Sequence, residues 1–245
     1  MMIGARPAGM GGAYVALADD PEALFWNPAG LEQVSGRMFS TFVSRPFGIK
    51  ELTLGSAGYT QPTPWGRWGV GLKTFGTKVY RENTFGLCHS RTLSGGLCLG
   101  ATLKIFNLTI DRYGSTFAYG IDLGCLLELG RQLYGGFFIT NVTNPHIGKV
   151  HEHIPNLISI GLRSSSTGRL ILTAEVQSES RSGVQFHAGQ EYRFSNVFAL
   201  RIGLQTNPTD FTTGIGFYFS RYRLDYAFSS HSVLGLTHQA SLTLW

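Results

Sequence analysis

The sequence has 245 residues and a formal net charge of +5, and only 14% of its residues are charged. Ordinary soluble domains contain about 25% charged residues, while the 43% of hydrophobic residues excludes a disordered chain. The 32 glycines argue against a helical bundle. Because the 20 lysines and arginines are scattered along the chain, we expect no nucleic-acid partner.

No run of 18 apolar residues occurs, which excludes a transmembrane helix. The composition therefore favours an all-β protein whose apolar residues are thinly spread, as in a membrane β-barrel. No basic region followed by an apolar core opens the sequence. We expect the signal peptide that such a barrel needs either to lie upstream of Met1 or to have been removed.

The first 35 residues differ from the rest because their apolar residues follow no period of two. Their glycines suit a tightly packed backbone. The sequence predicts a short helix capped by Asp20, with Pro21 at its first position. We expect this helix to run to Trp26 and to end at the breaker cluster of residues 27–30.

From residue 36 onward, short alternating runs are separated by Gly, Pro, Asn, Asp and Ser. Most runs contain about 10 residues, the length that a tilted strand needs to cross a bilayer. An even number of strands also places both ends of the chain on one side. We therefore predict a closed antiparallel transmembrane β-barrel of about 14 strands. The expected strands are 36–44, 50–60, 66–75, 79–90, 93–106, 115–127, 131–142, 156–165, 169–177, 182–192, 197–206, 211–221, 222–229 and 236–245.

The alternation separates an apolar face from a face of small and isolated charged residues. Leu200 and Ile202, for example, oppose Arg201 and Gly203. A soluble β-sandwich also alternates, but its polar face collects many charges in contact with water. The glycine-rich face instead favours the narrow lumen of a barrel, in which charges need partners or water. The predicted lumen-lining residues are Arg67, Lys73, Lys104, Asp122, Arg163, Glu175, His187, Arg201, Arg223 and Asp225.

Motifs for catalysis or cofactor binding are weak. The Gly-Met-Gly-Gly sequence at residues 9–12 follows no strand and precedes no Lys-Ser/Thr pair, so we expect no nucleotide. His146, His151 and His153 could bind a metal ion, but a solvated outer loop is the stronger interpretation. No Gly-x-Ser-x-Gly elbow occurs with a suitable histidine and acid. The expected protein is not an enzyme and holds no cofactor or metal.

Four linked N-terminal motifs resemble the PorV/PorQ family, which is related to the FadL group of outer-membrane transporters of hydrophobic compounds. The motifs are Gly4-Ala5-Arg6, Gly9-Met10-Gly11-Gly12-Ala13, Ala18-Asp19-Asp20-Pro21 and Trp26-Asn27-Pro28-Ala29-Gly30-Leu31. A looser agreement extends to Asn141, to Ile154-Pro155 and to Leu224-Asp225-Tyr226-Ala227-Phe228.

This resemblance implies a fourteen-stranded barrel of residues 36–245, with residues 1–35 folded inward as a plug or hatch. The implied plug and gate residues are Arg6, Gly9, Met10, Gly11, Gly12, Asp19, Asp20, Trp26, Asn27, Pro28 and Gly30.

The resemblance also implies a place in the bacterial outer membrane and passive transport of hydrophobic or amphipathic small molecules. The expected partners are outer-membrane lipid, the barrel-assembly machinery and such a small molecule. The outer loops are short compared with those of FadL transporters, which leaves a second hypothesis. A PorV-like barrel would dock components of a type IX protein secretion system.

Overall fold

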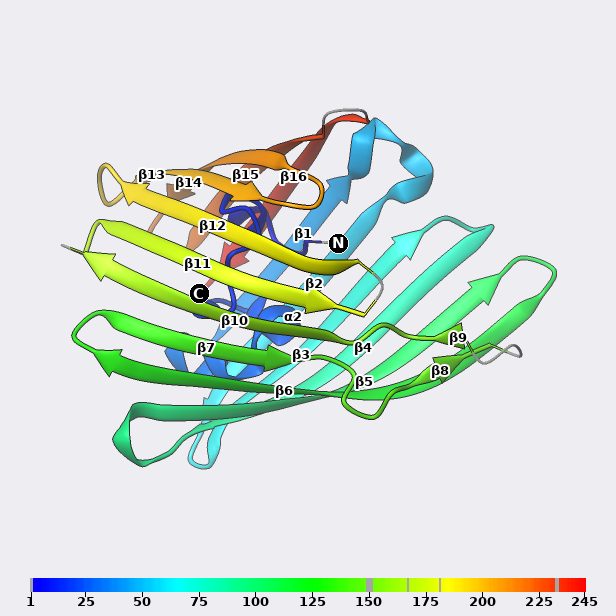
Figure 1. Cartoon of the computed structure of the whole chain (residues 1–245), viewed down its shortest axis with the longest axis horizontal. Helices are drawn as coiled ribbons and strands as arrows, with labels where there is room; N and C mark the ends of the chain where they lie inside the picture. The colour runs from blue at the N-terminus through cyan, green and yellow to red at the C-terminus, as the bar shows by residue number, and fades with distance from the viewer. Residues whose placement is uncertain (1, 149–151, 167, 181, 232–233) are drawn as a thin grey trace.

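The computed structural model describes residues 2–148, 152–166, 168–180, 182–231 and 234–245. Fourteen strands of the described chain form one closed antiparallel barrel (Figure 1). Strands adjacent in the barrel order pair with one another, and β1 closes the ring against β16. This ring confirms the predicted fold class and strand number. The strands of the ring are β1 (Met38–Arg45), β2 (Leu54–Thr63), β3 (Gly66–Gly76), β4 (Tyr80–Thr92), β5 (Leu97–Ile110), β6 (Gly114–Gly130), β7 (Leu133–Ile139), β10 (Leu157–Ser166), β11 (Leu170–Glu179), β12 (Gly183–Arg193), β13 (Phe198–Gln205), β14 (Asp210–Tyr218), β15 (Tyr222–His231) and β16 (Gly235–Leu244).

The barrel has two different ends. One end, which we call the turn end, carries the start of β1, the end of β16 and the six connections that follow β2, β4, β6, β10, β12 and β14. The other end, the loop end, carries the two longest connections, residues 46–53 and 140–156. Within the second of these, β8 (His146–Ile147) pairs with β9 (Glu152–His153) in a separate two-stranded sheet.

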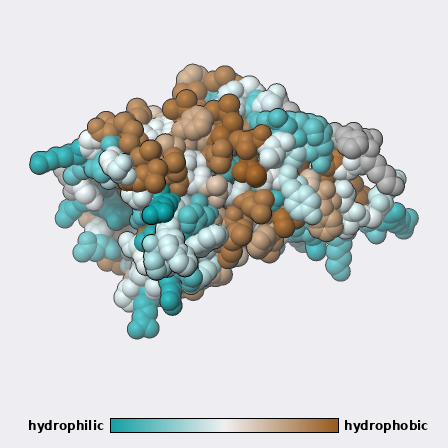
Figure 2. Space-filling view, turned by 90° about the horizontal axis from the view of Figure 1, so that it is seen from below, coloured by the Kyte–Doolittle hydropathy of each residue, from teal (hydrophilic) through white to brown (hydrophobic). Residues whose placement is uncertain are grey.

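The period of two in the sequence becomes the inside and outside of the barrel. In β13, Ile202 is 63% exposed on the outer surface, whereas Arg201 is 1% exposed inside. Figure 2 shows apolar residues over the middle of one face, with hydrophilic side chains protruding at its ends. None of the helices in the described part of the chain has the length and apolar content to cross a membrane.

The N-terminal segment, which we define as residues 2–35, lies inside the ring of strands (Figure 1). It contains α1 (Ala5–Gly9), α2 (Ala23–Trp26) and the 3-10 helix η1 (Pro28–Gln33). The prediction of a helix ending at Trp26 is confirmed, but α1 is a helix that the sequence did not predict.

The predicted capping role of Asp20 is wrong. The residue before α2 is Glu22, and no side chain caps this helix. The Asp20 carboxylate instead accepts hydrogen bonds from Tyr14 and Arg223. The side chain of Asn27 caps the next helix, η1, because its Oδ1 atom accepts a hydrogen bond from the backbone nitrogen of Ala29 at 3.1 Å.

The first connection also departs from the prediction. The expected second strand began at residue 50, but two 3-10 turns, η2 (Pro46–Gly48) and η3 (Lys50–Leu52), precede β2. Phe47 and Gly48 both have positive φ angles, of 57° and 73°. This backbone turns the chain at the loop end, so that pairing with β3 begins only at Leu54.

Candidate functional site

Inward-facing glycines of the barrel wall form a surface on which the N-terminal segment packs. A Cβ atom placed on Gly203 would lie 2.0 Å from the backbone nitrogen of Gly11, and one on Gly124 would lie 2.1 Å from Asn27 Oδ1. Real Cβ atoms do not come this close, so only glycine lets the two backbones approach. We call the wall glycines that touch the segment the glycine bed: Gly58, Gly69, Gly71, Gly86, Gly100, Gly124, Gly136, Gly161, Gly189, Gly203 and Gly214.

Polar side chains of the wall hold the backbone of the segment above this bed. The Glu175 carboxylate accepts hydrogen bonds from the backbone nitrogens of Tyr14 and Val15 at 2.9 and 3.0 Å. His187 Nδ1 lies 2.7 Å from the carbonyl oxygen of Gly11. The backbone nitrogen of Gly11 donates to the Thr212 hydroxyl at 2.9 Å. Two of the predicted lumen residues, Glu175 and His187, therefore contact the N-terminal segment directly.

Six charged residues form a closed ring between the segment and three strands. Arg6 Nε lies 2.7 Å from a Glu191 oxygen, and Arg201 Nε lies 2.7 Å from the same oxygen. Arg201 and Arg223 both pair with Asp225, at 2.7 and 2.5 Å. Arg223 also pairs with Asp20 at 2.9 Å, and Asp20 lies 3.6 Å from Arg6. The members of this ion ring are Arg6, Glu191, Arg201, Asp225, Arg223 and Asp20.

The ion ring contains three arginines and three carboxylates, all of them buried. Burial of charge is tolerated only where each charge is paired and hydrogen-bonded. Two tyrosines supply further contacts: the Tyr14 hydroxyl donates to Asp20 at 2.7 Å, and the Tyr218 hydroxyl accepts from Arg201 at 3.2 Å. Asp19 adds an ion pair with Arg6. The ring thus couples the segment to β12, β13 and β15.

Glu22 lies beside the ring and differs from its carboxylates. Burial, together with the negative charge of Asp20, holds the pKa of Glu22 well above the ordinary range of a glutamate. Its Oε2 atom is buried and has no hydrogen-bond partner among the described residues. The packed segment therefore favours the protonated form of Glu22 more than water does.

Raising the pH is expected to loosen the N-terminal segment. Because the pKa of Glu22 is higher in the packed segment than in a released one, packing binds a proton. The stabilising contribution is complete below the ordinary pKa of glutamate and is lost as the pH rises through the raised pKa. Hydrogen exchange of residues 2–35, corrected for intrinsic rates, should therefore accelerate with pH, and Glu22→Gln should remove this extra acceleration. An unchanged pH dependence in Glu22→Gln would contradict the assignment.

Of two further predicted lumen residues, Arg163 binds the end of the N-terminal segment and Arg67 binds Gly36, the residue that follows it. Arg67 Nη1 donates to the Gly36 carbonyl at 3.0 Å. Arg163 Nη1 donates to Gln33 Oε1 at 2.6 Å and lies over the Tyr134 ring, 4.1 Å from its centroid.

The remaining three predicted lumen residues are Lys73, Lys104 and Asp122. They lie on the inner wall closer to the loop end. Lys104 forms an ion pair with Asp122, whose Oδ1 atom accepts from the backbone nitrogen of Asn141 at 2.9 Å. Lys73 lines a small cavity of about 210 Å³ together with Glu82. All ten predicted lumen residues therefore lie on the inner face of the barrel.

The eleven residues predicted for the plug and gate lie in the N-terminal segment, and nine of them are buried; Asp19 and Trp26 are half-buried. Gly11 and Gly12 turn the backbone with φ angles of +66° and +78°. A Cβ atom on Gly30 would lie 2.3 Å from the Ala18 carbonyl oxygen. Asn27 Nδ2 donates to the carbonyl oxygens of Val15 and Cys125 at 2.8 and 3.0 Å, which ties the segment to itself and to β6.

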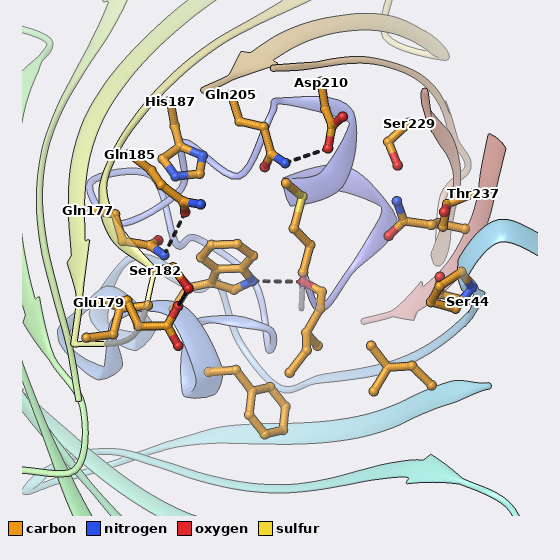
Figure 3. Close-up of a pocket in the computed structure, with 18 of the residues that line it drawn as sticks. Ser44, Gln177, Glu179, Ser182, Gln185, His187, Gln205, Asp210, Ser229 and Thr237 are labelled. Carbon is orange, nitrogen blue, oxygen red and sulfur yellow. Dashed lines mark hydrogen bonds between the residues drawn. The ribbon is translucent and has the colours of Figure 1, made fainter. Parts of the chain in front are cut away.

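A cavity of about 460 Å³ lies between this segment and the loop end of the barrel (Figure 3). Its floor consists of four residues of the segment, Met2, Ile3, Phe25 and Trp26. The Trp26 indole nitrogen donates to the Ile3 carbonyl at 2.8 Å, which holds the ring in this floor. Polar side chains line much of the wall: Ser44, Thr140, Ser159, Gln177, Glu179, Ser182, Gln185, His187, Gln205, Asp210, Ser229, His231, Thr237 and Gln239.

The histidine-rich connection does not form a metal site within the described residues. His146 and His153 face each other across the β8–β9 pair, with ring centroids 5.3 Å apart. His151 lies outside the described residues. No group of three potential metal ligands occurs in the part of the chain that the structure describes.

Two residues that matter most at this site, Glu191 and Tyr14, were not predicted. Glu191 follows His187 by four positions on the same strand and so shares its inward face, which is a signal that the sequence did contain. Tyr14 has no such signal, because the N-terminal segment has no strand periodicity.

Comparison with solved structures places this geometry among known channels. The structure aligns with the CymD monoaromatic hydrocarbon channel at a TM-score of 0.73 and 13% identity, covering 99% of this chain and 97% of that one. The toluene transporter TbuX of Ralstonia pickettii gives the same values. A FadL homologue from Pseudomonas aeruginosa gives a TM-score of 0.71 at 13% identity, over 97% of both chains.

The chain shares the fold of these channels. No protein-family model matches the sequence, and neither does any curated protein sequence. At 13% identity the likeness extends to the barrel and its topology.

Proposed function

We propose that this protein is a channel of the bacterial outer membrane for passive passage of small hydrophobic or amphipathic molecules. The observation that carries the proposal is the cavity at the loop end, whose apolar floor is formed by the N-terminal segment. Its volume of about 460 Å³ lies in the range of small-molecule sites. The shared fold with hydrocarbon and toluene transporters supports this reading.

In this proposal a ligand enters from the loop end and places its apolar part on Phe25 and Trp26. Burial of apolar surface there contributes roughly 25 cal/mol for each Å² removed from water. The serine and glutamine side chains of the wall offer hydrogen bonds to a polar group of the ligand. No covalent step is required, because passage follows the concentration gradient.

We further propose that residues 1–35 act as a plug and residues 36–245 as the channel wall. The segment lies directly below the cavity and packs on the glycine bed from β2 to β14. Passage beyond the cavity then requires the segment to give up some of these contacts.

Uptake into liposomes whose outer leaflet is lipopolysaccharide, which hydrophobic solutes cross slowly without a channel, tests the proposal. Reconstituted protein should accelerate the entry of toluene over that of a sugar of similar size, and Ser229→Trp, which places an indole in the cavity, should slow toluene entry severalfold. Ser229 lines the cavity, whereas its neighbour Ser230 is exposed on the outer surface, so Ser230→Trp is the matched control. Equal rates with and without protein would contradict the proposal.

The PorV-like docking function stays a prediction from the N-terminal motifs. The structural neighbours described above are channels and give it no support. Co-purification of secretion components with the barrel from its native membrane is the observation that would favour it.

A further inference from the structure

Arginines recur around the turn end of the barrel with a regular spacing. The start of β1 and each of the six short connections carry at least one arginine in the connection itself or within two residues of it, and we take the one nearest to each. Two of the seven, Arg67 and Arg193, are half-buried and bond to Gly36 and Glu191. The other five are exposed, and we call them the arginine collar: Arg37, Arg91, Arg131, Arg169 and Arg221.

The collar is distributed around the whole circumference. Its members lie before β1, at the end of β4, between β6 and β7, before β11 and before β15. In the order of the ring, adjacent members are therefore two or four strands apart. A partner that contacts all five must surround the barrel.

The exposed charged side chains of the turn end are almost all positive. Among the described residues of the turn end, Glu128 is the only exposed acidic side chain, and Glu32 is half-buried and accepts from Ser90 and Thr92. The loop end is mixed: its described exposed basic residues are Arg45, Lys50, Lys78, Arg81 and Arg112, and its exposed acidic residues are Glu51, Asp111 and Glu152. Among these described residues, exposed basic side chains outnumber exposed acidic ones by four at the turn end and by two at the loop end, and those of the turn end are all guanidinium groups.

Large aromatic side chains lie on the outer surface beside the collar. Trp65 is 72% exposed, and Trp68, Phe194, Phe219 and Trp245 are exposed close to the same turns. Exposed tryptophan and other aromatic rings mark the level at which a barrel meets lipid headgroups. The collar thus lies where the phosphate groups of a surrounding leaflet would be.

We propose that the arginine collar binds the phosphate groups of anionic phospholipids in the leaflet around the turn end. A guanidinium group presents paired N–H donors that match two phosphate oxygens, a geometry that a lysine cannot offer. No side chain in the described part of the chain pairs with the five collar guanidinium groups, which surround the full circumference as a lipid annulus requires. The proposal rests on the proposed membrane location but is independent of whether the barrel transports anything.

Native mass spectrometry of the full-length protein in neutral detergent tests this inference. The parent protein should retain more molecules of phosphatidylglycerol than of phosphatidylcholine. Each arginine near a lipid surface is worth about fivefold in affinity, so replacing all five collar arginines with glutamine should lower phosphatidylglycerol retention at least tenfold. Replacing all five with lysine keeps the charge and should give an intermediate loss.

A matched control removes the same number of charges from the other end. Glutamine at Arg45, Lys50, Lys78, Arg81 and Arg112 should change retention less than twofold. Equal losses in both fivefold variants, or equal retention of the two lipids by the parent, would overturn the proposal. So would displacement of phosphatidylglycerol by millimolar inorganic phosphate, since the collar would then be a site for free phosphate.

Folding of each variant is checked by its heat-dependent migration on a gel. If the fivefold variant does not fold, the single variants Arg131→Gln and Arg169→Gln replace it, with an expected severalfold loss each. Unchanged retention in both folded single variants would then overturn the proposal. A failure of toluene uptake with intact lipid selectivity would affect the proposed transport alone.

Discussion

Gly203→Val is expected to displace the N-terminal segment from the lumen while leaving the barrel closed. The new side chain would start 2.0 Å from the backbone of Gly11 and 2.3 Å from that of Met10, so the segment has to move. Valine itself suits a β-strand, which leaves the pairing of β13 intact. Chymotrypsin should then cleave after Tyr14, which is buried in the parent protein, and single-channel recordings should show a higher conductance.

Gly55→Val is the matched control for this experiment. Gly55 also lies in a strand but faces outward, and a Cβ atom there would meet its nearest neighbour, Thr74, at an ordinary 3.5 Å. We expect it to leave both conductance and resistance to chymotrypsin at Tyr14 unchanged. Resistance at Tyr14 in folded Gly203→Val would show that the glycine bed does not position the segment.

Glu191→Gln is expected to break the ion ring and to destabilise the packing of the N-terminal segment by about 3–5 kcal/mol. The substitution keeps the size of the side chain but removes the carboxylate that Arg6 and Arg201 share at 2.7 Å. Two buried guanidinium groups then lose a counter-charge, and such charges are far more costly than a lost surface pair. Hydrogen exchange of residues 5–20 should accelerate by at least a hundredfold.

Glu128→Gln provides the comparison, since Glu128 is exposed at the turn end. Removal of an exposed carboxylate should change hydrogen exchange in the segment by less than twofold. Equal protection in parent and Glu191→Gln would mean that the ion ring contributes little to holding the segment.

The barrel could be predicted because apolar side chains alternate with small or polar side chains along each strand. This alternation separates an outer face from an inner face. Ile202 must be apolar outside and Gly203 must be small inside, and this requirement repeats along each strand. The reason for the small residues could not be predicted in full. A narrow lumen was expected, whereas Gly203 is small because the backbone of Gly11 packs against it. That contact depends on how deep the segment lies.

The candidate site could be predicted as a set of residues but not as an arrangement. Arg6, Asp20, Arg201, Arg223 and Asp225 were all expected inside, yet no local pattern indicates that they form one ring. Arg6 and Glu191 are 185 positions apart, and their pairing follows from the closure of the barrel. The helix α1 escaped prediction because it has only five residues, two of which are proline and glycine.

The ion ring also sets an order of assembly. Its two N-terminal members leave the ribosome first, but Glu191 on β12 and Arg223 on β15, with which they pair, belong to the last third of the chain. Until those strands have joined the sheet, Arg6 and Asp20 lack Glu191 and Arg223 as counter-charges and stay in water. The N-terminal segment can therefore dock only when the barrel closes. The time at which the segment becomes protected from protease thus reports the final step of barrel assembly.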